Sequence, residues 1–252
     1  MDVEPPKNAI SAEAMQDALN RMLTIIVNIA GDMPQRLFIH FEEKEPIKDF
    51  KPVYDMMAEA YLSLKSFSLL MFNRCFTQAS AILRTAMEQT SAAIVLLGDD
   101  EKRRRFIAMR NEHAYYLGLS EDNKKVFRKE HTKNNNINEY FDYGWFDSKN
   151  YGRDQIMDAA HMEEFKQDIK ENLNGFSHGS ISSFQLSGEK GDWSLLRKHG
   201  RRISMACCKL FDLLVCATAN FIGDEWFTWP IAECFPKFEG IYLSVFRCWV
   251  EP

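Results

Sequence analysis

The chain places one of its six histidines, His178, where a helix-like run of residues breaks. The surrounding stretch is Asn172-Leu173-Asn174-Gly175-Phe176-Ser177-His178-Gly179-Ser180, so glycines and serines flank the imidazole. An imidazole titrates near neutral pH and can accept or donate a proton, which makes His178 a candidate catalytic group. The alternative is structural: His178 ends a helix, and Gly175 and Gly179 form the turn that follows it. The spacing alone is compatible with both.

A second candidate group is the pair Arg84 and Glu88, which lie four residues apart in a strongly apolar stretch. On a helix this spacing brings the two side chains together. They follow Leu83 and Met87 by one residue, so they are expected at the edge of the buried face. Glu88 could then hold the Arg84 guanidinium in place for an anion. The alternative is an ordinary surface ion pair that contributes only about 0.3–0.5 kcal/mol.

A basic cluster occupies residues 102–105, where Arg103 and Arg104 are candidate contacts to nucleic-acid phosphates. Three acidic residues at 99–101 precede the cluster, so its local net charge is small. Acidic residues before basic ones also suit the dipole of a helix. A solvated helix face is therefore the alternative interpretation.

A second basic cluster, residues 198–202, includes Arg201 and Arg202, which are also candidate phosphate contacts. Positive charge near the start of a helix is opposed by the helix dipole, which favours a functional reason for the cluster. An exposed surface without a ligand is again the alternative. The net charge of −5 and the pI near 5.7 do not themselves indicate nucleic-acid binding.

The common signatures of metal, nucleotide and acyl-transfer sites are missing from the chain. It contains no HExxH, EF-hand loop, P-loop, GxGxxG or GxSxG. We therefore expect no metal site and no cofactor. Ser177 beside His178 does not make a catalytic triad, because adjacent residues lack the geometry of nucleophile and base.

The spacing of apolar residues predicts an all-α protein with a single multi-helix bundle. Asp32-Met33-Pro34 is expected to end the first helix, and residues 35–50 to connect it to the second. Helices are predicted over 11–31, 52–73, 76–97, 100–117, 121–130, 154–173 and 193–221.

The chain divides into a flexible N-terminus at 1–9, the bundle at 10–222 and a C-terminal tail at 223–252. The tail contains three tryptophans and several phenylalanines, and we expect it to pack on the bundle because such a large aromatic surface is rarely exposed.

Several features favour a cytoplasmic protein that does not enter a membrane. The N-terminus is acidic and lacks the apolar segment of a signal peptide. The most apolar stretch, residues 203–222, is interrupted by Lys209, Asp212 and Asn220, so a buried helix is expected there rather than a membrane span. The six cysteines form no CxxC pair and are expected to be buried, reduced thiols.

Two stretches resemble a bacterial domain family of unknown function. Residues 79–88 are similar to its "LLRSLLE" helix, and residues 174–180 are similar to its "SxxxHGS" element. These all-helical proteins are in turn similar to the HEPN superfamily, in which many members are metal-independent ribonucleases of toxin–antitoxin and phage-defence systems. The resemblance implies RNA as a substrate, a homodimer, and a protein partner in a defence or toxin system.

The resemblance also implies roles for the candidate residues. His178 would accept the RNA 2′-hydroxyl proton or protonate the leaving oxygen, Arg84 would hold the scissile phosphate, and Glu88 would orient Arg84. Active HEPN ribonucleases share an Arg-x4–6-His motif, but the position matching its arginine is Asn172 here. The alternative function is therefore a non-enzymatic helical module that recognises a nucleotide, an anion or a partner protein.

Overall fold

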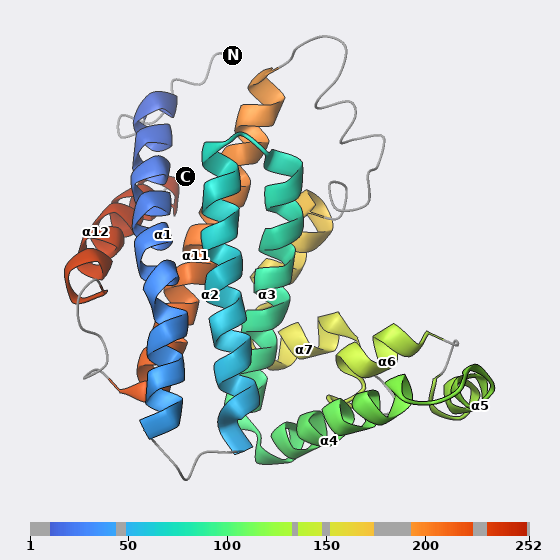
Figure 1. The fold of residues 1–252 in the computed structure, drawn as a ribbon. Helices are drawn as coiled ribbons and strands as arrows, with labels where there is room; N and C mark the ends of the chain where they lie inside the picture. The colour runs from blue at the N-terminus through green and yellow to red at the C-terminus, as the bar shows by residue number, and fades with distance from the viewer. Residues whose placement is uncertain are drawn as a thin grey trace.

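The protein is a bundle of long helices with a smaller helical part at one end, residues 100–143, which we call the arm (Figure 1). The computed structural model describes residues 11–43, 49–132, 136–147, 152–173, 193–223 and 231–250. The elements are α1 (Ala12–Glu43), α2 (Lys51–Phe72), α3 (Phe76–Gly98), α4 (Asp100–Leu117), α5 (Glu121–His131), α6 (Ile137–Tyr143), α7 (Arg153–Ala159), α8 (Glu163–Asp168), η2 (Ile169–Leu173), α11 (Trp193–Ile222) and α12 (Ile231–Val250). Within the described ranges every regular element is helical, which confirms the predicted all-α bundle.

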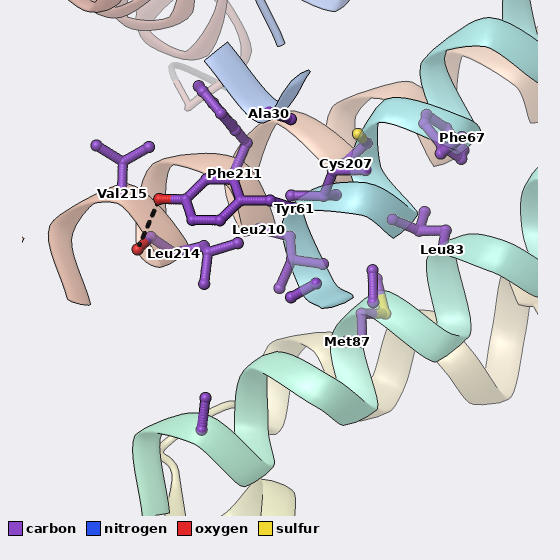
Figure 2. Packing of buried hydrophobic residues seen from close by; sticks show 14 of the residues in the cluster. Ala30, Tyr61, Phe67, Leu83, Met87, Cys207, Leu210, Phe211, Leu214 and Val215 are labelled. Atoms are coloured by element: carbon purple, nitrogen blue, oxygen red, sulfur yellow. Dashed lines mark hydrogen bonds between the residues drawn. The ribbon is translucent and has the colours of Figure 1, made fainter. Parts of the chain in front are cut away.

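The core of the bundle lies between α1, α2, α3 and α11: α2 and α11 each contact the other three helices. Figure 2 shows Tyr61 of α2, Leu83 and Met87 of α3, and Phe211 and Leu214 of α11 in one apolar cluster. All five side chains are fully buried. Burying a large apolar side chain stabilises a protein by about 1.5–3 kcal/mol, so this cluster is a main reason why the long helices stay together.

A buried hydrogen bond joins α2 to α11 within this core. The Thr218 hydroxyl donates to the Leu214 carbonyl oxygen at 2.7 Å, and the Tyr61 hydroxyl lies 3.0 Å from Thr218 Oγ1. Because the threonine proton is already used, the tyrosine is the donor to Thr218. Burial raises the pKa of Tyr61 above its ordinary value, so the phenol stays protonated and keeps this role.

Several helices begin where local sequence signals place them. The Asp99 side chain accepts a hydrogen bond from the Lys102 amide at 3.0 Å, and Ser120 Oγ accepts from the Asn123 amide at 3.4 Å. These are N-caps, which satisfy amides that a helix start would otherwise leave unpaired. The predicted bounds of α2, α3, α4, α5 and α11 accordingly agree with the structure to within two residues.

The predicted end of the first helix at Pro34 is wrong, because α1 continues through the proline to Glu43. A proline inside a helix removes one backbone hydrogen bond. Beyond it, however, Leu37 is almost completely buried, and His40 Nδ1 lies 2.6 Å from the Tyr54 hydroxyl of α2. The packing of this second half of α1 outweighs the local cost of the proline.

The single helix predicted over 154–173 is also wrong, because the chain breaks there into α7, α8 and η2. His161, expected inside the helix, has a φ of 55° and turns the chain between α7 and α8. Lys166 Nζ reaches back to Asp158 Oδ2 at 2.8 Å across this turn. The break allows Met157 and Met162, which flank the turn, both to be buried in the core.

The aromatic tail packs on the bundle, as predicted, through α12. Phe238 is fully buried, and its ring lies 4.9 Å from that of Phe211 in α11. α12 also contacts α1, which it crosses in Figure 1.

One helix in the described residues, α11, is long and apolar enough to cross a membrane over His199–Ile222. The central helix of a bundle meets the same criteria, and half of this window is buried by the other helices.

The surroundings of the cysteines agree only partly with the expectation that they are buried. Cys207 and Cys208 are buried, and burial raises the pKa of both thiols, whereas Cys216 is exposed.

Two helical glycines provide a matched test of the packing between α11 and α3. A Cβ at Gly200 would lie 2.9 Å from Cε1 of Phe76, whereas a Cβ at Gly240 would meet no atom within 4 Å. Both substitutions remove the helix penalty of glycine, about 1 kcal/mol. We expect Gly200→Ala to be less stable than Gly240→Ala by about 1–3 kcal/mol in urea denaturation, because of the steric clash. Equal stability of the two variants would contradict the close approach of α11 and α3.

Candidate functional site

The predicted pair of Arg84 and Glu88 forms an ion pair on α3. Arg84 Nε donates to Glu88 Oε1 at 3.0 Å. Each side chain retains only about a quarter of its exposure, 23% for Arg84 and 25% for Glu88. The pair is therefore not an exposed surface ion pair, and other helices partly cover it.

A second arginine, Arg153, joins this pair from the start of α7. Its Nη1 atom lies 3.7 Å from the same oxygen of Glu88 that Arg84 contacts. Its Nε and Nη2 atoms donate to Asp154 Oδ1 at 3.2 and 3.0 Å, and Lys170 Nζ lies 3.4 Å from Asp154 Oδ2. We call these five residues the Arg84 cluster. It combines side chains from α3, α7 and η2.

The Arg84 cluster contains three cationic side chains and two carboxylates, so its formal charge is positive. Burial alone would raise the pKa of Asp154, but hydrogen bonds and charges from Arg153 and Lys170 lower it. Asp154 is therefore ionised and fixes Arg153 from the side opposite Glu88. No spacing in the sequence indicates Arg153, because its partner Glu88 lies on another helix.

A cavity of about 320 Å³ opens beside the Arg84 cluster. Glu88 and Arg153 belong to both the cluster and the cavity wall. The cavity lies between the bundle helices α2, α3 and α7 on one side and the arm on the other. Its lining residues are Met56, Thr85, Glu88, Gln89, Ser91, Ala92, Phe106, Phe141, Asp142, Tyr143, Trp145, Arg153 and Ile156.

The aromatic wall of the cavity is held in place by contacts within the arm and with the bundle. Trp145 is almost completely buried, its Nε1 donates to the Asp142 carbonyl oxygen at 2.9 Å, and its ring meets that of Phe106 edge to face. Burial and the nearby Glu88 and Asp142 raise the pKa of Tyr143 to about 12, although Arg153 and Arg84 oppose this. Tyr143 is therefore a neutral phenol at the cavity, beside both guanidinium groups.

The other predicted catalytic residue, His178, falls in residues 174–192, which lie outside the described residues. The described chain leading to it ends at Leu173 of η2. This residue is buried, and η2 packs against α3, the helix that holds Arg84 and Glu88. In the part of the chain that the structure describes, no group of three or more His, Cys, Asp or Glu residues is placed to bind a metal ion.

The four arginines predicted to contact nucleic acid differ in their surroundings. Arg103 is buried: it donates to the Leu96 carbonyl oxygen at 2.7 Å, pairs with Asp100, and stacks over the Phe50 ring at 3.7 Å. Its guanidinium is thus used inside the protein and is not presented to a ligand. By contrast, Arg104 and Arg202 are exposed and Arg201 is half-buried.

The two basic clusters lie at opposite ends of the bundle. α4 begins at the end of α3 that is remote from the first turns of α11 (Figure 1). The exposed arginines Arg104 and Arg202 therefore belong to separate surfaces. Neither residue is part of the Arg84 cluster or lines the cavity.

His199, in the second basic cluster, points into the protein. It is buried, and its Nε2 lies 3.2 Å from Ser80 Oγ of α3. Since Ser80 donates to the Phe76 carbonyl oxygen at 2.9 Å, its hydroxyl oxygen can accept a hydrogen bond from the N–H at His199 Nε2. Burial, together with the charge of Arg202, lowers the pKa of His199 to about 4. This residue is therefore a neutral link between α11 and α3.

Comparison with known proteins gives one family. A model described as a family of unknown function (DUF5677) matches residues 50–192. The match includes α2 to η2, and so covers every helix that lines the cavity or contributes to the Arg84 cluster. No curated protein and no solved structure matches the chain.

The buried His199 predicts a pH dependence of stability. Its pKa is about 4 in the folded protein, against about 6.5 in an unfolded chain, so folding disfavours its protonation. Above pH 6.5 His199 is neutral in both the folded and the unfolded chain and does not affect the free energy of unfolding, which falls as the pH decreases from 6.5 towards 4. We expect His199 to lower the free energy of unfolding by about 3 kcal/mol at pH 4.

Urea denaturation of the wild type and His199→Asn between pH 7 and pH 4 measures this effect. The variant should lose less stability on acidification, because it lacks the titrating ring. His113→Gln, which changes an exposed histidine, is the control and should follow the wild type. Identical pH slopes for wild type and His199→Asn would contradict the proposed burial of a neutral ring.

Proposed function

The chain belongs to the DUF5677 family of unknown function, and we propose that it binds the phosphate of a nucleotide or of RNA at the Arg84 cluster. One observation carries the proposal. Arg84 and Arg153, from two helices, meet at the same oxygen of Glu88, and this meeting point lies at the edge of an aromatic cavity.

The chemistry of the cluster suits a phosphate. A guanidinium is always charged and presents several donors in one plane, which matches phosphate oxygens better than a lysine does. With Lys170 included, the Arg84 cluster carries one more positive than negative charge, which an anion would balance. Because Arg153 retains only 17% of its side-chain exposure, solvent and salt screen this attraction less than on an open surface.

The cavity supplies the second half of a nucleotide site. Its wall combines aromatic rings with a few polar groups, which is typical of pockets for small organic ligands. A ligand that carries both a phosphate and a flat ring would occupy the cluster and the cavity together. Recognition of a nucleotide is the alternative to RNA cleavage that the sequence motifs leave open.

RNA cleavage of the HEPN type is a second candidate function. Lys170 of η2 pairs with Asp154, and η2 packs against α3, so the chain enters the segment of His178 from beside the Arg84 cluster. In this proposal Arg84 holds the scissile phosphate, Glu88 orients Arg84, and His178 transfers the proton without a metal. The homodimer, the partner in a defence or toxin system and the cytoplasmic location are parts of the same proposal.

Phosphate binding is tested with AMP and ribose 5-phosphate in isothermal titration calorimetry at fixed salt. We expect Arg153→Ala to weaken both ligands at least tenfold, because it removes a donor that faces the cavity. Lys129→Ala removes one exposed positive charge on α5 and should change the affinity less than twofold. Failure of ribose 5-phosphate to bind, or an unchanged affinity in Arg153→Ala, would refute the phosphate site.

RNA cleavage is tested with single-stranded RNA in EDTA, resolved on a denaturing gel. His178→Ala is expected to abolish the cleavage by the full chain, whereas His113→Ala should retain it. Cleavage by His178→Ala at the wild-type rate would exclude this mechanism. If the wild type does not cut RNA but does bind AMP, the binding function remains as the proposal.

A further inference from the structure

Four aromatic residues line the cavity beside the Arg84 cluster. Phe106 comes from α4, Phe141 and Tyr143 come from α6, and Trp145 follows α6. Rings of this kind bind best to another flat, unsaturated ring by stacking or by edge contact. The volume of about 320 Å³ is at the low end for ligand pockets, so the cavity suits one heterocycle rather than a large cofactor.

The polar groups of the cavity include both acceptors and donors. Glu88 and Asp142 provide carboxylate oxygens, while Arg153 provides N–H groups. Gln89 accepts a hydrogen bond from Ser63 at 2.9 Å through its amide oxygen, so its amide nitrogen is left as a donor. A ligand that matches this wall must therefore carry donors and acceptors on the edge of its ring.

Asp142 is the carboxylate best placed to receive a ligand. Unlike Glu88, it forms no ion pair among the described residues, and its side-chain oxygens have no protein donor there. Partial desolvation and the charge of Glu88 raise its pKa, and the opposing effect of His113 is smaller, so its charged form is only partly compensated. Two N–H groups from a ligand would supply that compensation.

The geometry points to guanine as the base that this cavity binds, an inference that rests on the proposed nucleotide-binding function. Guanine carries two adjacent donors, N1–H and N2–H, which one carboxylate can accept together. On its other side O6 is an acceptor, which N–H donors recognise in protein–DNA complexes. Asp142 can accept from the two adjacent donors and the amide nitrogen of Gln89 can donate to O6, while the attached phosphate would reach Arg153 and Arg84 of the Arg84 cluster.

The other bases fit this set of groups less well. Adenine has one donor next to one acceptor and would leave a carboxylate oxygen facing a ring nitrogen. Uracil and cytosine offer no pair of adjacent donors within the ring edge.

The test compares the four ribonucleosides, which carry no phosphate, by calorimetry with the full chain. We expect guanosine to bind at least tenfold more tightly than adenosine, cytidine or uridine. Asp142→Asn, which keeps the size of the side chain, should weaken guanosine at least tenfold and remove this preference. Asp122→Asn makes the same change of charge at an exposed position of α5 and should leave guanosine binding within twofold of the wild type.

Two ligands separate this inference from the function on which it rests. Equal binding of the four nucleosides, or an unchanged preference for guanosine in Asp142→Asn, would overturn the assignment of guanine. Ribose 5-phosphate that still binds in that case would leave the phosphate site standing. Selective binding of guanosine without binding of ribose 5-phosphate would instead support the base site and refute the phosphate site.

Discussion

The meeting of two guanidinium groups at one carboxylate is the constraint on which the candidate site depends. Arg84 and Arg153 both lie within 3.7 Å of Glu88 Oε1, and all three side chains are mostly removed from water. Without the negative charge, two neighbouring cations in such a place would repel each other and lack compensation. Glu88 therefore joins α3 to α7 and at the same time defines one edge of the cavity.

α3 supports both the core and the site because its two faces have different partners. Leu83 and Met87 face α2 and α11 in the apolar core (Figure 2), while Arg84 and Glu88, one residue further on, are covered by α7. A one-residue step on a helix is a rotation of about 100°, which is enough to pass from one face to the next. The site is thus fixed by the same helix that the core holds rigid.

Most helix bounds could be predicted from the sequence, because apolar periodicity and N-caps such as Asp99 act locally. The two wrong predictions, at Pro34 and His161, arise from contacts between residues that are distant in the sequence. There the local signal predicts an end or a continuation, but burial of distant partners decides the outcome, as for Leu37 and Met162. Packing between elements overrides a local preference of a few kcal/mol, and a single sequence does not contain that packing explicitly.

The candidate site, like the helix bounds, could be predicted from the sequence only in part. Arg84 and Glu88 could be paired because both lie on one helix, whereas Arg153, which is 65 positions beyond Glu88, could not be assigned to them without the fold. Arg103 and Arg104 look alike in the sequence, but Arg103 lies three residues before the buried Phe106 and shares its face. Helical phase therefore distinguishes an internal arginine from an exposed one.

The arm of α4, α5 and α6 has a small apolar cluster of its own, formed by Tyr116, Phe127 and Tyr140, and projects from the bundle (Figure 1). One wall of the cavity belongs to this arm and the other to the bundle. The width of the cavity is then a function of the angle between the two parts. A molecule that bridges both walls favours one angle, and by thermodynamic reciprocity any contact that fixes the arm at that angle strengthens the binding of the molecule.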